Sequence, residues 1–218
     1  MKLRLPVWMF ASALLAGCNG FPAADFDRAS NATYFQVSSG MPFPGLFTGS
    51  AIQWNEDYAV TAGHIPLLRN VVHRCSTGCD LVFFRHKADH TFPAWRAAQP
   101  NEEVRAIGAS PFMITVSGQG RVIAGPFYNT AEHNRERYGI HDAPLTKGMS
   151  GGPLVATDGS IVGMNFGFHS TSLNPSSGKR LSGAKRISLF VPYSTVAREW
   201  KIYQGAGWGI PQPIKAVP

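Results

Sequence analysis

The stretch "TKGMSGGPLV", Thr146 to Val155, places one serine, Ser150, among three glycines. This composition suits neither a helix nor a strand, because glycine loses more conformational freedom on ordering than any other residue. It suits a tight turn in which the backbone passes close to its neighbours and presents a single hydroxyl. Pro153 then opens a short apolar segment, which indicates a strand. The sequence therefore predicts that Ser150 stands at an exposed turn that leads into a strand.

Short apolar segments separated by turn residues extend to both sides of this turn. The chain has 218 residues, with frequent Gly and Pro and only 15% charged residues, a composition typical of a β-rich protein. The predicted strands lie at 46–54, 58–62, 71–74, 80–87, 103–108, 114–125, 153–168 and 187–193. Their spacing predicts a sandwich or a barrel. One helix is predicted at 194–204, capped by Ser194, with Val196, Trp200 and Tyr203 on one face.

The N-terminus has the form of an export signal. After two basic residues, Leu5–Leu15 is an apolar run too short to span a bilayer comfortably. The sequence "LAGC" that ends this run resembles the lipobox of bacterial lipoproteins. The resemblance implies a signal peptide at 1–17, a lipid on Cys18 and localisation in the bacterial envelope. Asn19 favours the outer membrane, and residues 18–40 are expected to form a tether. A plain secretory signal is the alternative.

Two further cysteines, Cys75 and Cys79, enclose the short segment "STG". An exported protein meets an oxidising compartment, so this pair is expected to form a disulfide across a turn. The alternative is a structural zinc site that adds His73 and either His86 or His90 to the two thiolates.

Charge and composition exclude some functions. The net charge is +7, but Lys and Arg are scattered, and no basic run with interleaved aromatic residues occurs. Nucleic-acid binding therefore has little support.

Residues 205–218 show no periodicity and are expected to be an extended tail.

The chemistry of Ser150 requires partners elsewhere in the chain. A serine hydroxyl is a poor nucleophile until a base takes its proton, and the attack creates an oxyanion that needs donors. The amides of Gly148 and Ser150 are suited to be those donors. His64 follows the apolar strand "YAVTA" and is the candidate base, while Asp80 opens the apolar segment "LVFF" and is the candidate acid. Asp89 is the alternative acid.

These segments resemble the trypsin-like serine proteases. "TAGHI" and "KGMSGGPL" match the boxes around the base and the nucleophile, and His64, Asp80 and Ser150 follow the family's order. The closest resemblance, over residues 46–200, is to the protease domain of the high-temperature-requirement periplasmic proteases. It implies an all-β fold of two six-stranded antiparallel barrels with the site between them, here followed by a C-terminal helix. The protease domain is expected at 41–204.

The resemblance also implies a reaction. The chain is expected to be a serine endopeptidase that hydrolyses polypeptides through an acyl-enzyme and requires no cofactor. Met149 stands where digestive relatives carry an aspartate that pairs with a newly cut N-terminus. Activation by that switch is therefore not expected.

The specificity pocket is less defined by the sequence. Pro144 lies near the place where the family sets the base of its pocket, so cleavage after Lys or Arg is not supported. His141 approaches the same region. The strand that lines the pocket in relatives resembles Asn165, Phe166 and Gly167.

Two other functions compete with a protease. A protease-shaped lipoprotein that only binds a partner has no use for His64, Ser150 and Gly148. "GMSGG" also fits the Gly-x-Ser-x-Gly elbow of an α/β-hydrolase, which would make the chain an esterase. That elbow leads into a helix, whereas Pro153 opens a strand, and His169 is the sole later histidine. The substrate and the oligomeric state remain open.

Overall fold

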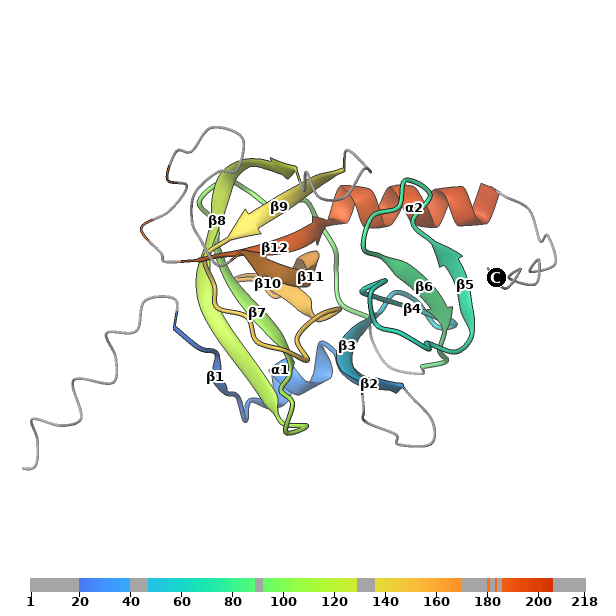
Figure 1. Ribbon diagram of the computed structural model, residues 1–218, viewed down its shortest axis with the longest axis horizontal. Coiled ribbons are helices and arrows are strands. Elements are labelled where there is room, and N and C mark those ends of the chain that lie inside the picture. The colour runs from blue at the N-terminus through green and yellow to red at the C-terminus, as the bar shows by residue number, and fades with distance from the viewer. Residues whose placement is uncertain are drawn as a thin grey trace, which may run out of the picture.

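The computed structural model describes residues 20–39, 47–88, 92–128, 136–169, 180, 183 and 186–205. The expected signal peptide, Cys18, Asp89, and the tail beyond Gly205 lie outside these residues. The described chain forms two β-sheets and one long helix (Figure 1). Its elements are β1 (Ala23–Ala24), α1 (Arg28–Ala32), β2 (Phe35–Ser39), β3 (Phe47–Gln53), β4 (Tyr58–Thr61), β5 (Val71–Arg74), β6 (Val82–Arg85), β7 (Glu103–Ala109), β8 (Thr115–Tyr128), β9 (Arg137–His141), β10 (Pro153–Ala156), β11 (Ile161–His169), β12 (Ile187–Pro192) and α2 (Tyr193–Gly205).

The larger sheet closes into a six-stranded barrel, as predicted. Its strands follow the order β8-β7-β10-β11-β12-β9, and β8 pairs with β9 to complete the circle. Closure is possible because β8 is 14 residues long. Its first half pairs with β7 and its second half with β9, with a shift in register between Ile123 and Phe127. Such an irregularity bends a strand and helps a sheet to close.

The smaller sheet has the order β2-β3-β4-β6-β5. It has five strands within the described residues, rather than the six expected for each barrel, and residues 40–46 and 89–91 lie outside the description. Its inner face is apolar because the branched and aromatic side chains of β3, β4 and β6 are buried, among them Ile52, Val60 and Phe83. The all-β prediction, with two β-halves and a C-terminal helix, is confirmed.

Helix α2 leaves the barrel at the end of β12 and packs on the smaller sheet (Figure 1). The ring of Trp200 lies 5.2 Å from that of Phe83 and 5.1 Å from that of Tyr58, measured between centroids. The helix begins at Tyr193, so Ser194 lies inside its first turn and is not the predicted cap. In the described part of the chain, no helix has both the length and the hydropathy needed to cross a bilayer.

Part of the segment 18–40, which was expected to form a tether, pairs with the two sheets. Ala23 and Ala24 pair with β8, and β2 pairs with β3 along its whole length. Val37 of β2 is buried in the core of the smaller sheet. These contacts form because short strands add to the edges of both sheets and satisfy their open backbone groups. The folded unit therefore starts near residue 23.

Candidate active site

The turn that carries Ser150 joins β9 to β10 and is fastened to the smaller sheet. The Ser150 carbonyl accepts a hydrogen bond from the Ser50 amide of β3 at 2.8 Å. The buried Ser50 hydroxyl donates to the Gly148 carbonyl at 2.8 Å and accepts from the Ala109 amide at 2.9 Å. Ser50 of β3 thus links the turn that carries Ser150 to the end of β7. The sequence reasoning missed Ser50, although a small polar residue inside an apolar strand was a signal.

The glycines of this turn are required by its geometry. Gly148 has φ +91°, and a Cβ at this position would lie 2.8 Å from the Ala109 carbonyl oxygen. Gly151 has φ +87°, and its Cβ would lie 1.9 Å from the Ser50 carbonyl oxygen. Residues with a side chain rarely adopt such angles, and here they would also collide with backbone. The glycine-rich composition of this turn is therefore explained by close backbone approach.

The amides of the turn fall into two groups. Those of Met149, Gly151 and Gly152 donate to backbone carbonyls at 3.2, 2.7 and 2.9 Å. The amides of Gly148 and Ser150 donate to no backbone carbonyl of the described residues. The two amides predicted to bind an oxyanion are therefore not occupied by a backbone carbonyl of the described residues.

His64 and Asp80 are brought together by the pairing of two strands. Thr61, the last residue of β4, lies opposite Val82, the first residue of β6, so the segments that flank these ends meet. Asp80 accepts from the His64 amide at 2.8 Å through Oδ1 and contacts His64 Nδ1 at 2.6 Å through Oδ2. A carboxylate accepts only, so Nδ1 carries a proton and Nε2 is the acceptor of the neutral ring. A separation of 16 residues in sequence is thus enough to bring Asp80 into contact with His64.

The exposure of the pair differs between its members. The His64 side chain is 50% exposed, whereas that of Asp80 is 12% exposed. Gly63 lies close against the acid, because a Cβ there would stand 3.2 Å from Asp80 Oδ1. The carboxylate is therefore enclosed while the imidazole faces solvent.

The turn that carries Ser150 lies against the segment that carries His64. A Cβ on Gly151 would stand 2.2 Å from the Thr61 hydroxyl, and a Cβ on Gly49 would stand 2.3 Å from Ile65 and 3.2 Å from the Ser150 carbonyl oxygen. The structure thus gathers the segments of all three candidate residues where the two sheets meet. The Ser150 hydroxyl donates to the Phe166 carbonyl at 3.2 Å.

Two of the predicted pocket residues, Asn165 and Phe166, have buried side chains. The Asn165 side chain is buried, donating to the Pro153 carbonyl at 2.9 Å and accepting from His141 Nε2 at 3.0 Å. Phe166 is buried against Tyr138, with ring centroids 4.5 Å apart. Their side chains are therefore turned into the core. Strand pairing explains this, because these residues continue β11 inside the closed barrel.

The remaining pocket candidates differ from one another. Pro144 is buried against β8, where a Cβ on Gly118 would stand 2.6 Å from the Pro144 carbonyl oxygen. Gly167 has open space at its Cβ position. His141 is fully buried, and burial lowers its pKa to about 4 because the charged ring loses its hydration. It therefore lies behind the site and not in an open pocket.

The Cys75–Cys79 pair forms a disulfide. The sulfur atoms of a disulfide are not thiolates, so the alternative zinc site loses two of its four ligands. His73 contacts Glu199, and His86 contacts Gln53, at 2.9 and 2.8 Å.

Comparison with known proteins gives structural matches only. No protein-family model and no curated protein matches the sequence. The serine endoprotease from Yersinia pestis superposes with a TM-score of 0.61 at 18% identity, over 85% of this chain and 68% of that one. The HtrA-type protease AlgW, solved with a tripeptide, gives 0.58 at 19%, over 81% and 62%. The MamO protease domain from Magnetospirillum magneticum gives 0.57 at 18%, over 76% and 93%.

The chain thus spans less than two thirds of the length of AlgW. At identities this low, the likeness concerns the fold, and it agrees with the closed barrel, the second sheet and the terminal helix. The chain has the trypsin-like double-barrel fold of the HtrA-type serine proteases.

Proposed function

We propose that the protein is a serine endopeptidase. The observation that carries this proposal is the double attachment of His64 to Asp80, through Nδ1 at 2.6 Å and through the backbone amide at 2.8 Å. It fixes both the orientation and the tautomer of the ring, and this tautomer makes Nε2 the basic nitrogen. The adjoining turn presents Ser150, which gives the base a nucleophile to activate.

In the proposed reaction, the Ser150 hydroxyl turns away from the Phe166 carbonyl and attacks the scissile carbonyl carbon. His64 Nε2 takes the hydroxyl proton, and the Asp80 carboxylate stabilises the imidazolium. The amides of Gly148 and Ser150 bind the oxyanion. His64 then gives its proton to the leaving amine as the peptide bond breaks. Water, deprotonated by His64, attacks the acyl-enzyme, and His64 returns this proton to the departing Ser150 oxygen, which releases the acid product and restores the Ser150 hydroxyl.

The substrate is proposed to be a polypeptide, and none of these steps uses a cofactor. The tripeptide in the AlgW structure supports this substrate class. We further propose that the enzyme is held on the envelope by a lipid on Cys18, a proposal that rests on the "LAGC" sequence. Membrane fractionation of the Cys18→Ala variant tests the anchor: the variant should leave the membrane fraction, and retention there would contradict it.

The activity is tested on the full chain, in mild detergent, beside its Ser150→Ala twin. Casein should be cut by the first only, and a serine-directed organophosphonate should label the first only. Fragments from both proteins would point to a contaminant. A folded wild-type protein that neither cuts nor labels would contradict the proposal and favour a binding protein of protease shape.

The acid is tested separately. Asp80→Asn is expected to reduce turnover roughly 10⁴-fold with the fold retained, because the ring loses its tautomer and its counter-charge. Asp158→Asn, an exposed aspartate paired with Arg96, is the matched control. Unchanged turnover for Asp80→Asn with loss for Asp89→Asn would move the role to Asp89.

A further inference from the structure

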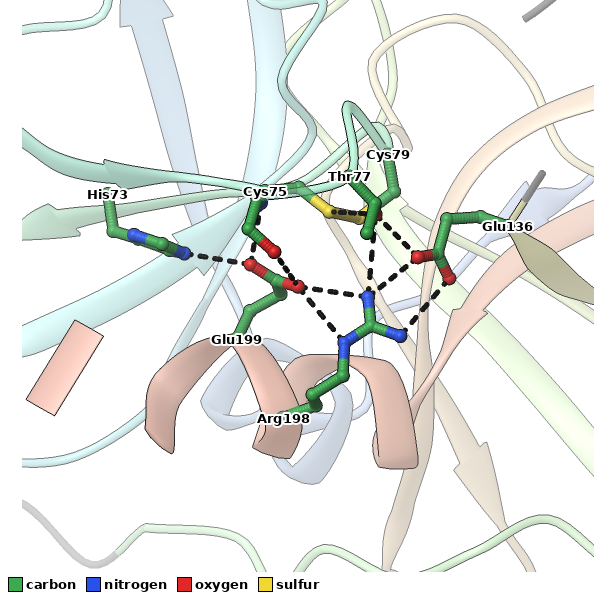
Figure 2. A network of polar contacts seen from close by, with 8 residues as sticks. His73, Cys75, Thr77, Cys79, Glu136, Arg198 and Glu199 are labelled. Atoms are coloured by element: carbon green, nitrogen blue, oxygen red, sulfur yellow. Dashed lines mark hydrogen bonds and ion pairs between the residues drawn. A yellow bond between two sulfur atoms is a disulfide. The ribbon is translucent and has the colours of Figure 1, made fainter. Parts of the chain in front are cut away.

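A buried carboxylate lies behind the turn that leads to Asp80. Glu199 of α2 has no exposed surface, yet it is surrounded by donors (Figure 2). It accepts from the Ser76 amide at 2.7 Å, from the Ser76 hydroxyl at 2.9 Å and from His73 Nε2 at 2.9 Å. Arg198 donates to it from Nη2 at 2.9 Å. Burial raises the pKa of Glu199, but these hydrogen bonds outweigh it and hold the pKa below its usual value.

The network reaches across the whole turn. Arg198 also donates to Glu136, at 2.7 Å, and the Thr77 hydroxyl donates to the same carboxylate (Figure 2). His73 lies at the end of β5, just before Cys75 of the disulfide. Both the entry to the turn and its tip are therefore held by charged groups outside it.

The Cys75–Cys79 turn in its observed position holds Asp80 in place. The Leu81 amide donates to the Cys79 carbonyl at 2.8 Å, which encloses Asp80 in a three-residue turn. The Cys75 amide donates to the Leu81 carbonyl at 3.0 Å, so the two sides of the disulfide turn are joined at the residue that follows Asp80. A displacement of Ser76 would therefore be passed to the acid through few bonds.

A buried charge is an expensive way to stabilise a fold. Well-packed apolar residues usually serve as well, whereas a fully hydrogen-bonded carboxylate fixes geometry. We propose that Glu199 is a positioning residue that acts through the Cys75–Cys79 turn to hold Asp80 against His64. This inference rests on the proposed function, and it assigns a part in the reaction to α2, which contributes no reacting group.

The first test measures the pKa of the His64 ring, by NMR of the full chain, and needs no activity. Glu199→Gln should lower this pKa by about one unit, because a displaced Asp80 stabilises the imidazolium less. Ser76→Ala, a gentler change to the same network, should lower it by less. Glu103→Gln, at an exposed glutamate paired with Arg121, is the matched control and should leave it unchanged. An unchanged pKa in a folded Glu199→Gln or Ser76→Ala protein overturns the inference.

The second test is a double-mutant cycle on the rate of phosphonate labelling. Glu199→Gln should slow labelling on the order of 10²-fold, as expected for a small misplacement of a catalytic group. In the Asp80→Asn background the same change should slow it no further, because the residue through which it acts has lost its role. Equal slowing in both backgrounds overturns the inference and leaves the protease intact. Absence of labelling in the wild-type protein overturns the proposed function, while the His64 titration still decides the position of Asp80.

Discussion

At the scale of single residues, Gly148 combines a left-handed backbone with a crowded surrounding. Gly148→Ala is expected to lower the free energy of unfolding by about 2–3 kcal/mol, because the strain of a positive φ adds to a contact with the Ala109 carbonyl. It should also abolish phosphonate labelling by turning the amide away. Urea unfolding and labelling measure the two effects.

Gly159 supplies the matched control for this change. Its φ is +82°, but nothing lies within 4 Å of its Cβ position. Gly159→Ala should therefore lower the free energy of unfolding only by the backbone strain, about 1 kcal/mol. The variant should react with the phosphonate as the wild-type protein does. Equal losses at the two glycines would show that crowding at Gly148 is not the cause.

His141 gives the fold a dependence on pH. Its pKa is about 4 in the folded protein, against an ordinary value of 6.5, because the ring is buried. The unfolded chain therefore takes up the proton first as the pH falls. The free energy of unfolding should drop by about 3 kcal/mol between pH 6.5 and pH 4 and then level off. Urea unfolding across this range measures it.

The variant that isolates this contribution is His141→Gln, whose amide retains a donor for Asn165. Its unfolding free energy should vary less between pH 6.5 and pH 4 than that of the wild-type protein. His169→Gln, on the same barrel, should keep the full dependence. Parallel pH curves for the wild-type protein and His141→Gln would contradict the assignment.

Local patterns were enough to name His64, Asp80 and Ser150 as candidates, because each stands near the boundary of an apolar strand. They were not enough for Glu199, whose donor Ser76 is 123 positions away. A signal was present, since Glu199 shares the apolar face of α2 with Val196 and Trp200. A charged residue on such a face predicts a buried partner but does not name it.

At the scale of elements, the Cys75–Cys79 turn is the smallest closed unit of the fold. Replacing both cysteines by serine should lower the free energy of unfolding by about 2 kcal/mol, the value expected for a very short loop. Urea unfolding of the double variant measures it, and the same loss should appear when the wild-type protein is reduced. A double variant as stable as the wild-type protein would show that the network around Glu199 holds the turn alone.

Strong strands were predicted well, and weak ones were not. The segment 71–74 coincides with β5, since the β-branched pair Val71 and Val72 marks it. β2 was missed because its short polar sequence, "FQVSS", becomes a strand only by pairing with β3. β9 was missed beside the charged sequence "EHNRER", although Tyr138 and Ile140 alternate as buried residues do. In both, tertiary pairing outweighs local preference.

At the scale of the whole molecule, the N-terminal segment completes both sheets. Deleting residues 1–39 should lower the melting temperature by roughly 10 °C or more, because it removes β1, α1 and β2 and opens the edge of β3. Deleting residues 1–19 should change it by about 2 °C or less. Circular dichroism on heating measures both, and equal stability of the two truncations would return residues 20–39 to the role of a tether.

The bond between Glu199 and Ser76 also sets an order in time. A chain made from its N-terminus presents Ser76 long before Glu199, since 123 positions separate them. Contacts this distant in sequence close late. The turn behind Asp80 therefore receives its last support only when α2 has emerged. Under the inference above, Ser150 and His64 are by then already present, but Asp80 is not yet held in position. Under the proposed function, activity would therefore begin only after the C-terminal helix α2 has docked.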